Sequence, residues 1–120
     1  MEKRTEKLSR ILNELNIDGL FITDLYNIRY FTGFTGTTGV ALATKNGNFF
    51  FSDFRYKAQA TKQVTEMGFE FVEVSRGSLQ TVGEYIKKFG LKNVGFEDIN
   101  VSFSLYQTIK DIFKVELVPV

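Results

Sequence analysis

Apolar residues recur at helical spacing in several parts of the chain. Leu8, Ile11, Leu12 and Leu15 follow the i, i+3, i+4, i+7 rule and predict an amphipathic helix over residues 3–16. The same spacing predicts helices from residue 54 to about 67, from 78 to about 89, and from about 103 to 113. Their apolar stripes are Tyr56, Ala60, Val64 and Met67, then Leu79, Val82, Ile86 and Phe89, and finally Leu105, Ile109, Ile112 and Phe113.

Short apolar or alternating runs between these helices predict strands. The runs cover residues 20–22, 40–44, 49–51, 69–74, 94–96 and 115–118. Residues 69–74 alternate apolar and charged side chains, which is typical of a strand with one exposed face or of a strand at a sheet edge. The run 20–22 is apolar on both faces, which indicates an α/β sheet covered on both sides.

The segment Lys45-Asn46-Gly47-Asn48 predicts a hairpin between two of these strands, because Asn-Gly between strand-like runs is a strong turn signal. The returning strand contains Phe49, Phe50 and Phe51. Side chains alternate along a strand, so three consecutive phenylalanines require that both faces of it be covered.

Polar residues before the helices suggest where each one starts. Asp24 is expected to cap a short helical turn that runs to about Tyr30, Ser78 to cap the third long helix, and Ser102 or Ser104 to cap the last. Pro119 is expected to interrupt strand pairing just after the last strand.

The element order therefore has one hairpin and otherwise helical crossovers. This order predicts one α/β domain with a three-layer fold: a mixed, mostly parallel sheet of five to six strands with helices on both faces. The length of 120 residues fits a single domain with its own core.

Composition narrows the classes of function. The formal charge of +1 argues against nucleic-acid binding by bulk electrostatics. Cysteine is absent, no apolar run approaches the roughly 20 residues of a membrane span, and the N-terminus lacks a signal-peptide pattern. The expectation is a cytoplasmic protein with neither nucleic acid nor membrane as a partner.

Histidine is also absent. This removes the commonest general base, the commonest metal ligand and every Ser-His or Cys-His catalytic arrangement from the chain. A metal site would need carboxylates alone, and the sequence has no Asp/Glu pair at the short spacing that such a site usually shows. We therefore expect neither a catalytic residue nor a metal ligand here.

The most distinctive stretch is Asn27 to Gly39, with its companion segment Ser52-Asp53-Phe54-Arg55-Tyr56. Glycine at positions 33, 36 and 39 permits backbone conformations or close approaches that a side chain would block. One interpretation is a glycine-rich connection that caps a buried sheet. The other is a loop that presents Arg29, Tyr30, Phe34 and Arg55 to a ligand or to another domain.

Arg29 and Arg55 are the strongest polar candidates, because a guanidinium matches a carboxylate through two parallel hydrogen bonds. The carboxylate could be a peptide C-terminus or a partner's acidic side chain. Alternatively, Arg55 pairs internally with Asp53 or a helix end and only holds the loop.

The string Asn27-Ile28-Arg29-Tyr30-Phe31-Thr32-Gly33-Phe34-Thr35-Gly36, followed by a hairpin, Asp53-Phe54-Arg55-Tyr56 and Val94-Gly95-Phe96-Glu97, resembles the N-terminal domain of the creatinase/prolidase family. These proteins are Xaa-Pro aminopeptidases and Xaa-Pro dipeptidases. The resemblance covers essentially all of residues 1–120 and implies a ribonuclease-H-like α/β fold.

The resemblance further implies a separate C-terminal "pita-bread" catalytic domain, absent from this chain, that holds two divalent metals, manganese or cobalt. That domain cleaves the peptide bond before proline in proline-containing peptides. The chain itself should bind no cofactor and hydrolyse nothing.

In this family the N-terminal domain packs in a homodimer and helps wall the partner's active-site cleft. The resemblance therefore implies roles in dimerisation and substrate access. Arg29 joins this set because its guanidinium could bind a carboxylate. The residues expected to face substrate or partner are Asn27, Arg29, Tyr30, Phe34, Thr35, Arg55 and Tyr56.

A second hypothesis is a free-standing binding or adaptor domain that reuses the same fold, since a fold does not dictate function. The two hypotheses differ in whether the reading frame continues past Val120 into a metal-binding domain.

Overall fold

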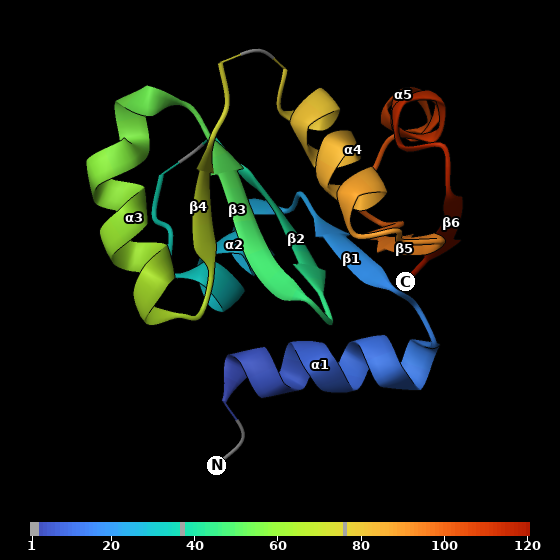
Figure 1. The fold of residues 1–120 in the computed structure, drawn as a ribbon, viewed down its shortest axis with the longest axis horizontal. Coiled ribbons are helices and arrows are strands. Elements are labelled where there is room, and N and C mark those ends of the chain that lie inside the picture. The colour runs from blue at the N-terminus through green and yellow to red at the C-terminus, as the bar shows by residue number, and fades with distance from the viewer. Residues whose placement is uncertain (1–2, 37, 76) are drawn as a thin grey trace.

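The computed structural model describes residues 3–36, 38–75 and 77–120, and its helices and strands alternate along the chain as predicted (Figure 1). The elements are α1 (Arg4–Leu15), β1 (Gly19–Ile22), α2 (Leu25–Thr32), β2 (Val40–Thr44), β3 (Gly47–Ser52), the 3₁₀ turn η1 (Phe54–Tyr56), α3 (Lys57–Glu66), β4 (Glu70–Glu73), α4 (Ser78–Lys88), β5 (Asn93–Phe96), α5 (Phe103–Phe113) and β6 (Glu116–Pro119).

The strands form one sheet in the order β4-β3-β2-β1-β5-β6. Strand β2 runs antiparallel to both of its neighbours, β1 and β3, and the other three pairings are parallel. All the strands except β2 therefore point the same way. Their carboxyl ends share one edge of the sheet, and β2 begins at that edge.

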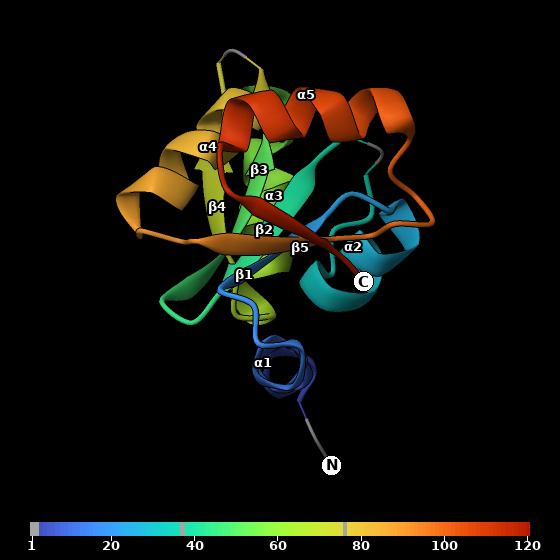
Figure 2. The same ribbon diagram turned by 90° about the vertical axis from the view of Figure 1, so that its right-hand side faces the viewer.

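Helices cover both faces of the sheet, so the predicted three-layer fold is confirmed (Figures 1 and 2). Buried residues of α1, α2 and α3 pack in one core cluster, and those of α4 and α5 pack in another on the opposite face. Phe50 lies in the first cluster, while Phe49 and Phe51 lie in the second. The run of three phenylalanines thus contributes to both cores. Strand β4 is an edge strand, which is one of the two alternatives that its alternation left open.

Two predicted helix caps are confirmed. The side chain of Asp24 accepts a hydrogen bond from the Asn27 N–H, and that of Ser102 accepts one from the Leu105 N–H. The predicted Ser78 cap is wrong. Ser78 is already the first residue of α4, and the N-cap position is occupied by Gly77, which has no side chain to supply the bond.

Two further details differ from the sequence predictions. The hairpin turn lies one residue early, at Lys45 and Asn46, and Gly47 pairs with Thr44 as the first residue of β3. Pro119 does not end strand pairing, because it pairs with Phe96 and the Val120 N–H still donates to the Phe96 carbonyl at 3.0 Å. Strand β6 is an edge strand, so the proline nitrogen can face its unpaired side.

Within the described residues, no helix combines the length and the hydrophobicity that crossing a bilayer requires.

Candidate functional site

The two segments singled out in the sequence meet at the carboxyl edge of the sheet. Asp53 and η1 follow β3 directly, and the loop of residues 33–39 leads into β2 from the same edge. The Ser52 hydroxyl donates to the Thr38 carbonyl at 2.7 Å, which ties the loop to the end of β3. In open α/β sheets, ligands bind outside the carboxyl ends of the strands.

Phe34 anchors this loop in the core. Its side chain is 1% exposed, and its ring centroid lies 4.7 Å from that of Phe50 and 5.6 Å from that of Tyr56. Gly33 has φ +78° as the C-cap of α2, a conformation that L side chains rarely adopt. A Cβ on Gly36 would collide with the Phe34 ring. Both glycines are therefore needed to seat the ring. The sequence predicted that glycine would permit such conformations and close approaches, but it placed Phe34 toward a ligand or partner, whereas the structure buries it.

Thr35 is exposed and connects the loop to α3. Its hydroxyl accepts hydrogen bonds from the side-chain amides of Gln59 at 3.1 Å and Gln63 at 3.2 Å. The Gln63 side-chain oxygen accepts from the Thr35 N–H at 3.3 Å. The loop backbone is thus held directly after Phe34. Thr37 lies outside the described residues.

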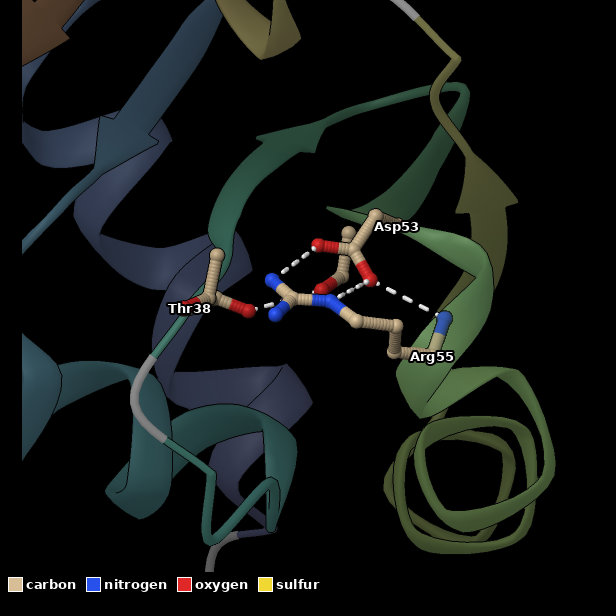
Figure 3. A network of polar contacts seen from close by, with 4 residues as sticks. Thr38, Asp53 and Arg55 are labelled. Carbon is tan, nitrogen blue, oxygen red and sulfur yellow. Dashed lines mark hydrogen bonds and ion pairs between the residues drawn. The ribbon is translucent and has the colours of Figure 1, made fainter.

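Arg55 folds back onto Asp53, so the internal pairing that the sequence left open is present (Figure 3). Arg55 Nε donates to Asp53 Oδ1 at 3.0 Å, and Nη2 donates to Oδ2 at 2.8 Å. The hydrogen bond from the guanidinium lowers the pKa of Asp53 below its usual value, and the same bond raises the pKa of Arg55. The Arg55 side chain is nevertheless 62% exposed, so it remains available at the surface.

Tyr56 and neighbouring residues of α3 extend this surface. The Arg55 guanidinium carbon lies 5.4 Å from the centre of the Tyr56 ring. Arg55, Lys57 and Lys62 border a shallow cavity of about 640 Å³ together with Phe54, whose side chain is 72% exposed. An exposed ring beside cationic groups is chemically suited to a partner segment that carries both apolar and acidic side chains.

Asn27 lies in a different arrangement, at the start of α2. Its side-chain amide donates to Glu97 Oε2 at 2.6 Å. Glu97 Oε1 accepts from the backbone N–H groups of Thr23 at 2.6 Å and Asp24 at 2.9 Å, and from the Thr23 hydroxyl at 3.1 Å. This half-buried carboxylate follows β5 and satisfies free donors at the helix N-terminus, where negative charge is favoured.

Tyr30 faces α1 rather than the loop. The Arg4 guanidinium lies 4.5 Å from the centre of the Tyr30 ring and donates to the Tyr30 carbonyl at 2.8 Å, and Lys7 Nζ lies 5.1 Å from the same ring. Arg29 is exposed in the last turn of α2, and no side-chain partner for it is found among the residues that the structure describes.

The predicted residues thus divide into groups. The first, which we call the loop corner, brings together Phe34, Thr35, Arg55 and Tyr56. The second, which we call the Glu97 corner, contains Thr23, Asp24, Asn27 and Glu97, while Arg29 and Tyr30 belong to neither.

Sequence reasoning did not select Glu97, Gln59 or Gln63 as site residues. An acidic side chain directly after a short buried strand was the available signal for Glu97, because such a residue lies at the carboxyl edge. The two glutamines stand four residues apart on a predicted helix, which places them on one face, but nothing local indicated that Thr35 lies opposite.

Metal ligation finds no support in this part of the chain. Among residues 3–36, 38–75 and 77–120, no three His, Cys, Asp or Glu side chains are grouped so that they could hold a metal ion. The carboxylates described above instead serve as a helix cap, an arginine partner and an acceptor for α2. These residues therefore offer no site for the metals, which the resemblance implies for a separate C-terminal domain.

Comparison with known proteins finds matches along almost the whole chain. A family model for the creatinase/prolidase N-terminal domain matches residues 4–120. The chain is 39% identical over 118 residues to an uncharacterised peptidase, YqhT, from Bacillus subtilis. The aligned region makes up 98% of this chain but 33% of that protein.

Solved structures of similar fold also match along almost the whole chain. An Xaa-Pro dipeptidase from Bacillus anthracis matches with a TM-score of 0.91 and 34% identity, over 98% of this chain and 32% of that one. An Xaa-Pro aminopeptidase chain from Streptococcus thermophilus matches with a TM-score of 0.89 and 32% identity, over 98% of this chain and 89% of that one. The chain therefore spans about a third of the length of the two Bacillus proteins, whereas the Streptococcus chain was solved at nearly this size.

Proposed function

The chain belongs to the creatinase/prolidase N-terminal domain family, and we propose that it is the non-catalytic N-terminal domain of a metal-dependent Xaa-Pro peptidase. The observation that carries this proposal is the pattern of coverage. Almost the entire chain aligns, yet it accounts for only about a third of a peptidase and of an Xaa-Pro dipeptidase. The remaining two thirds of such a protein would contain the catalytic domain.

The division of labour follows from this proposal. The C-terminal domain would bind two divalent metals, manganese or cobalt, and would cleave the bond before proline in cytoplasmic peptides. The present domain would contact that catalytic domain, take part in a homodimer and border the partner's active-site cleft. Its contribution to catalysis would be substrate access rather than chemistry.

Within the domain, the loop corner is the part best suited to border a cleft. Phe34 and the Thr35 hydrogen bonds brace its backbone, while Arg55 and Phe54 remain exposed beside it. A braced backbone loses little conformational entropy when a partner binds to it. The Arg55 guanidinium could exchange Asp53 for the carboxylate of a peptide or of the partner subunit, since both offer the same bidentate geometry.

The proposal is tested first by the reading frame. It predicts that the frame continues past Val120 into a segment with histidine and carboxylate metal ligands. A frame that stops there would support the alternative, a free-standing adaptor domain.

The role of Arg55 is tested by kinetics of the full-length product. Arg55→Ala should raise KM for Xaa-Pro peptides by roughly tenfold, the equivalent of one charged hydrogen bond at about 1.5 kcal/mol. Lys110→Ala on α5 is the control, because that exposed lysine lies on the other face of the sheet. Equal kinetics for both variants would exclude Arg55 from substrate access.

A further inference from the structure

Exposed apolar side chains are concentrated in one part of the surface. Seven large apolar residues of the described chain are exposed, and five of them come from the start of α2, the loop after β5, the start of α5 and the end of the chain. We call these five the exit patch: Leu25, Tyr26, Ile99, Phe103 and Val120. Their exposed fractions are 45%, 79%, 100%, 77% and 39%.

The segments of the exit patch are held next to one another. The Asn100 side-chain amide donates to the Thr23 hydroxyl at 2.9 Å, which fixes the loop after β5 beside the start of α2. Ile99 and Val120 line one cavity of about 490 Å³, whose wall also includes Asn27 and Phe31 of α2. Figure 2 shows α2, the loop that leads into α5, and the C-terminus on the same side of the molecule.

An exposed group of this kind needs an explanation. Single exposed apolar residues are ordinary, but five from adjoining segments are typical of a surface that another body covers. Neither core cluster includes any of the five. The hydrogen bonds of the Glu97 corner hold the backbone beneath the patch, so its exposure does not reflect a loose segment.

The position of Val120 is the observation that favours one occupant of the exit patch. Its N–H donates to the Phe96 carbonyl at 3.0 Å, and its carbonyl accepts from the Asp98 N–H at 3.4 Å, so the backbone at position 120 is fixed against the end of β5. In a protein three times this length, residue 121 would leave from the rim of the patch. A covalently attached segment has a high effective concentration at such a site, and it would cover the patch before a separate molecule could.

We infer that the exit patch is the docking surface for the polypeptide that follows Val120 in the same chain, that is, for its own catalytic domain. The loop corner would remain free for the partner subunit. This inference rests on the proposed function, since it requires a C-terminal domain. It adds to that proposal the surface that the catalytic domain contacts and the surface that the partner subunit contacts.

Hydrogen exchange provides the first test, with wild-type full-length protein and the isolated domain of residues 1–120. A Streptococcus homologue solved at nearly this size indicates that such a domain folds by itself. Amides of residues 98–103 should exchange at least tenfold more slowly in the full-length protein, at every protein concentration. Equal exchange in both proteins would overturn the inference. Protection that disappears on dilution would also overturn it, because a second copy would then be the occupant.

A matched pair of variants provides the second test. Leu25 and Leu15 are both 45% exposed, but Leu15 ends α1 at the opposite edge of the sheet. Leu25→Gln and Ile99→Asp should accelerate release of the domain from full-length protein by thermolysin at least fivefold, while Leu15→Gln should leave that rate unchanged. Similar rates for all three would contradict the inference.

The isolated domain separates a folding defect from a docking defect. The same variants should leave its unfolding midpoint within about 2 °C of wild type, because each replaced side chain is exposed. Failure of the proposed function would look different. The wild-type gene product would then lack a second domain and Xaa-Pro peptidase activity, whatever its exchange rates.

Discussion

The two corners of the carboxyl edge hold their residues in opposite ways. In the Glu97 corner, one half-buried carboxylate accepts hydrogen bonds from residues 70 to 74 positions away, so polar groups hold the start of α2 against the end of β5. In the loop corner, the buried Phe34 ring is the main anchor and the Thr35 hydroxyl adds hydrogen bonds to α3, whereas Arg55 pairs locally with Asp53 and remains exposed. The first arrangement uses its polar groups to join elements of the fold. The second leaves the Arg55 guanidinium available to a partner.

Removal of the buried ring should have the largest effect. Phe34→Ala is expected to destabilise the isolated domain by about 3–5 kcal/mol, the usual cost of deleting a fully buried phenylalanine side chain. Urea unfolding measures this loss. Phe54→Ala is the control, because its side chain is 72% exposed, and it should change stability by no more than about 0.5 kcal/mol. Equal effects would mean that Phe34 does not anchor the loop.

Glu97→Gln tests the polar corner and should have a smaller effect. The substitution removes the charge and one acceptor oxygen, so we expect a loss of about 1–3 kcal/mol in urea unfolding. Asp98→Asn next to it is the control, since Asp98 is exposed, and it should have little effect. If the control cost as much as Glu97→Gln, the four hydrogen bonds would not distinguish this corner.

Thr35→Val should come next. It removes the hydroxyl that accepts from Gln59 and Gln63, at a partly solvated site where water can replace the bonds. We expect a loss of about 0.5–1 kcal/mol in the isolated domain. Thr61→Val, at an exposed position of α3, is the control and should lie within about 0.5 kcal/mol of wild type. A loss as large as that of Phe34→Ala would contradict the place of the buried ring as the main anchor of the loop corner.

Arg55→Ala should have the smallest effect on stability and a clear effect on titration. The guanidinium lowers the folded-state pKa of Asp53, so its stabilising contribution is present above the unfolded pKa and is lost as pH falls through the folded pKa. The variant should raise the Asp53 pKa toward its usual value, as followed by NMR of the carboxyl carbon. Lys62→Ala should leave it unchanged. An unshifted Asp53 in the Arg55 variant would show that the pair does not form in solution.

The extent of sequence-based prediction also differs between the corners. Helices, strands and the hairpin follow local periodicity and turn chemistry, and the hairpin signal predicts that β2 and β3 are antiparallel neighbours. The antiparallel pairing of β2 with β1 was not predicted. The glycines of the loop corner were recognisable for the same local reason. The Glu97 corner was not recognisable from the sequence, because its hydrogen bonds join residues far apart in the chain. The burial of Phe34 was missed since its neighbours Phe50 and Tyr56 come from other elements.

The most direct test of the account is a peptidase assay on Xaa-Pro peptides with added Mn²⁺, comparing residues 1–120 with the uninterrupted gene product at equal concentration. The account predicts an active full-length protein and a domain with no activity above background. Hydrolysis by the isolated domain, or an inactive full-length protein that binds metal and is folded, would contradict it.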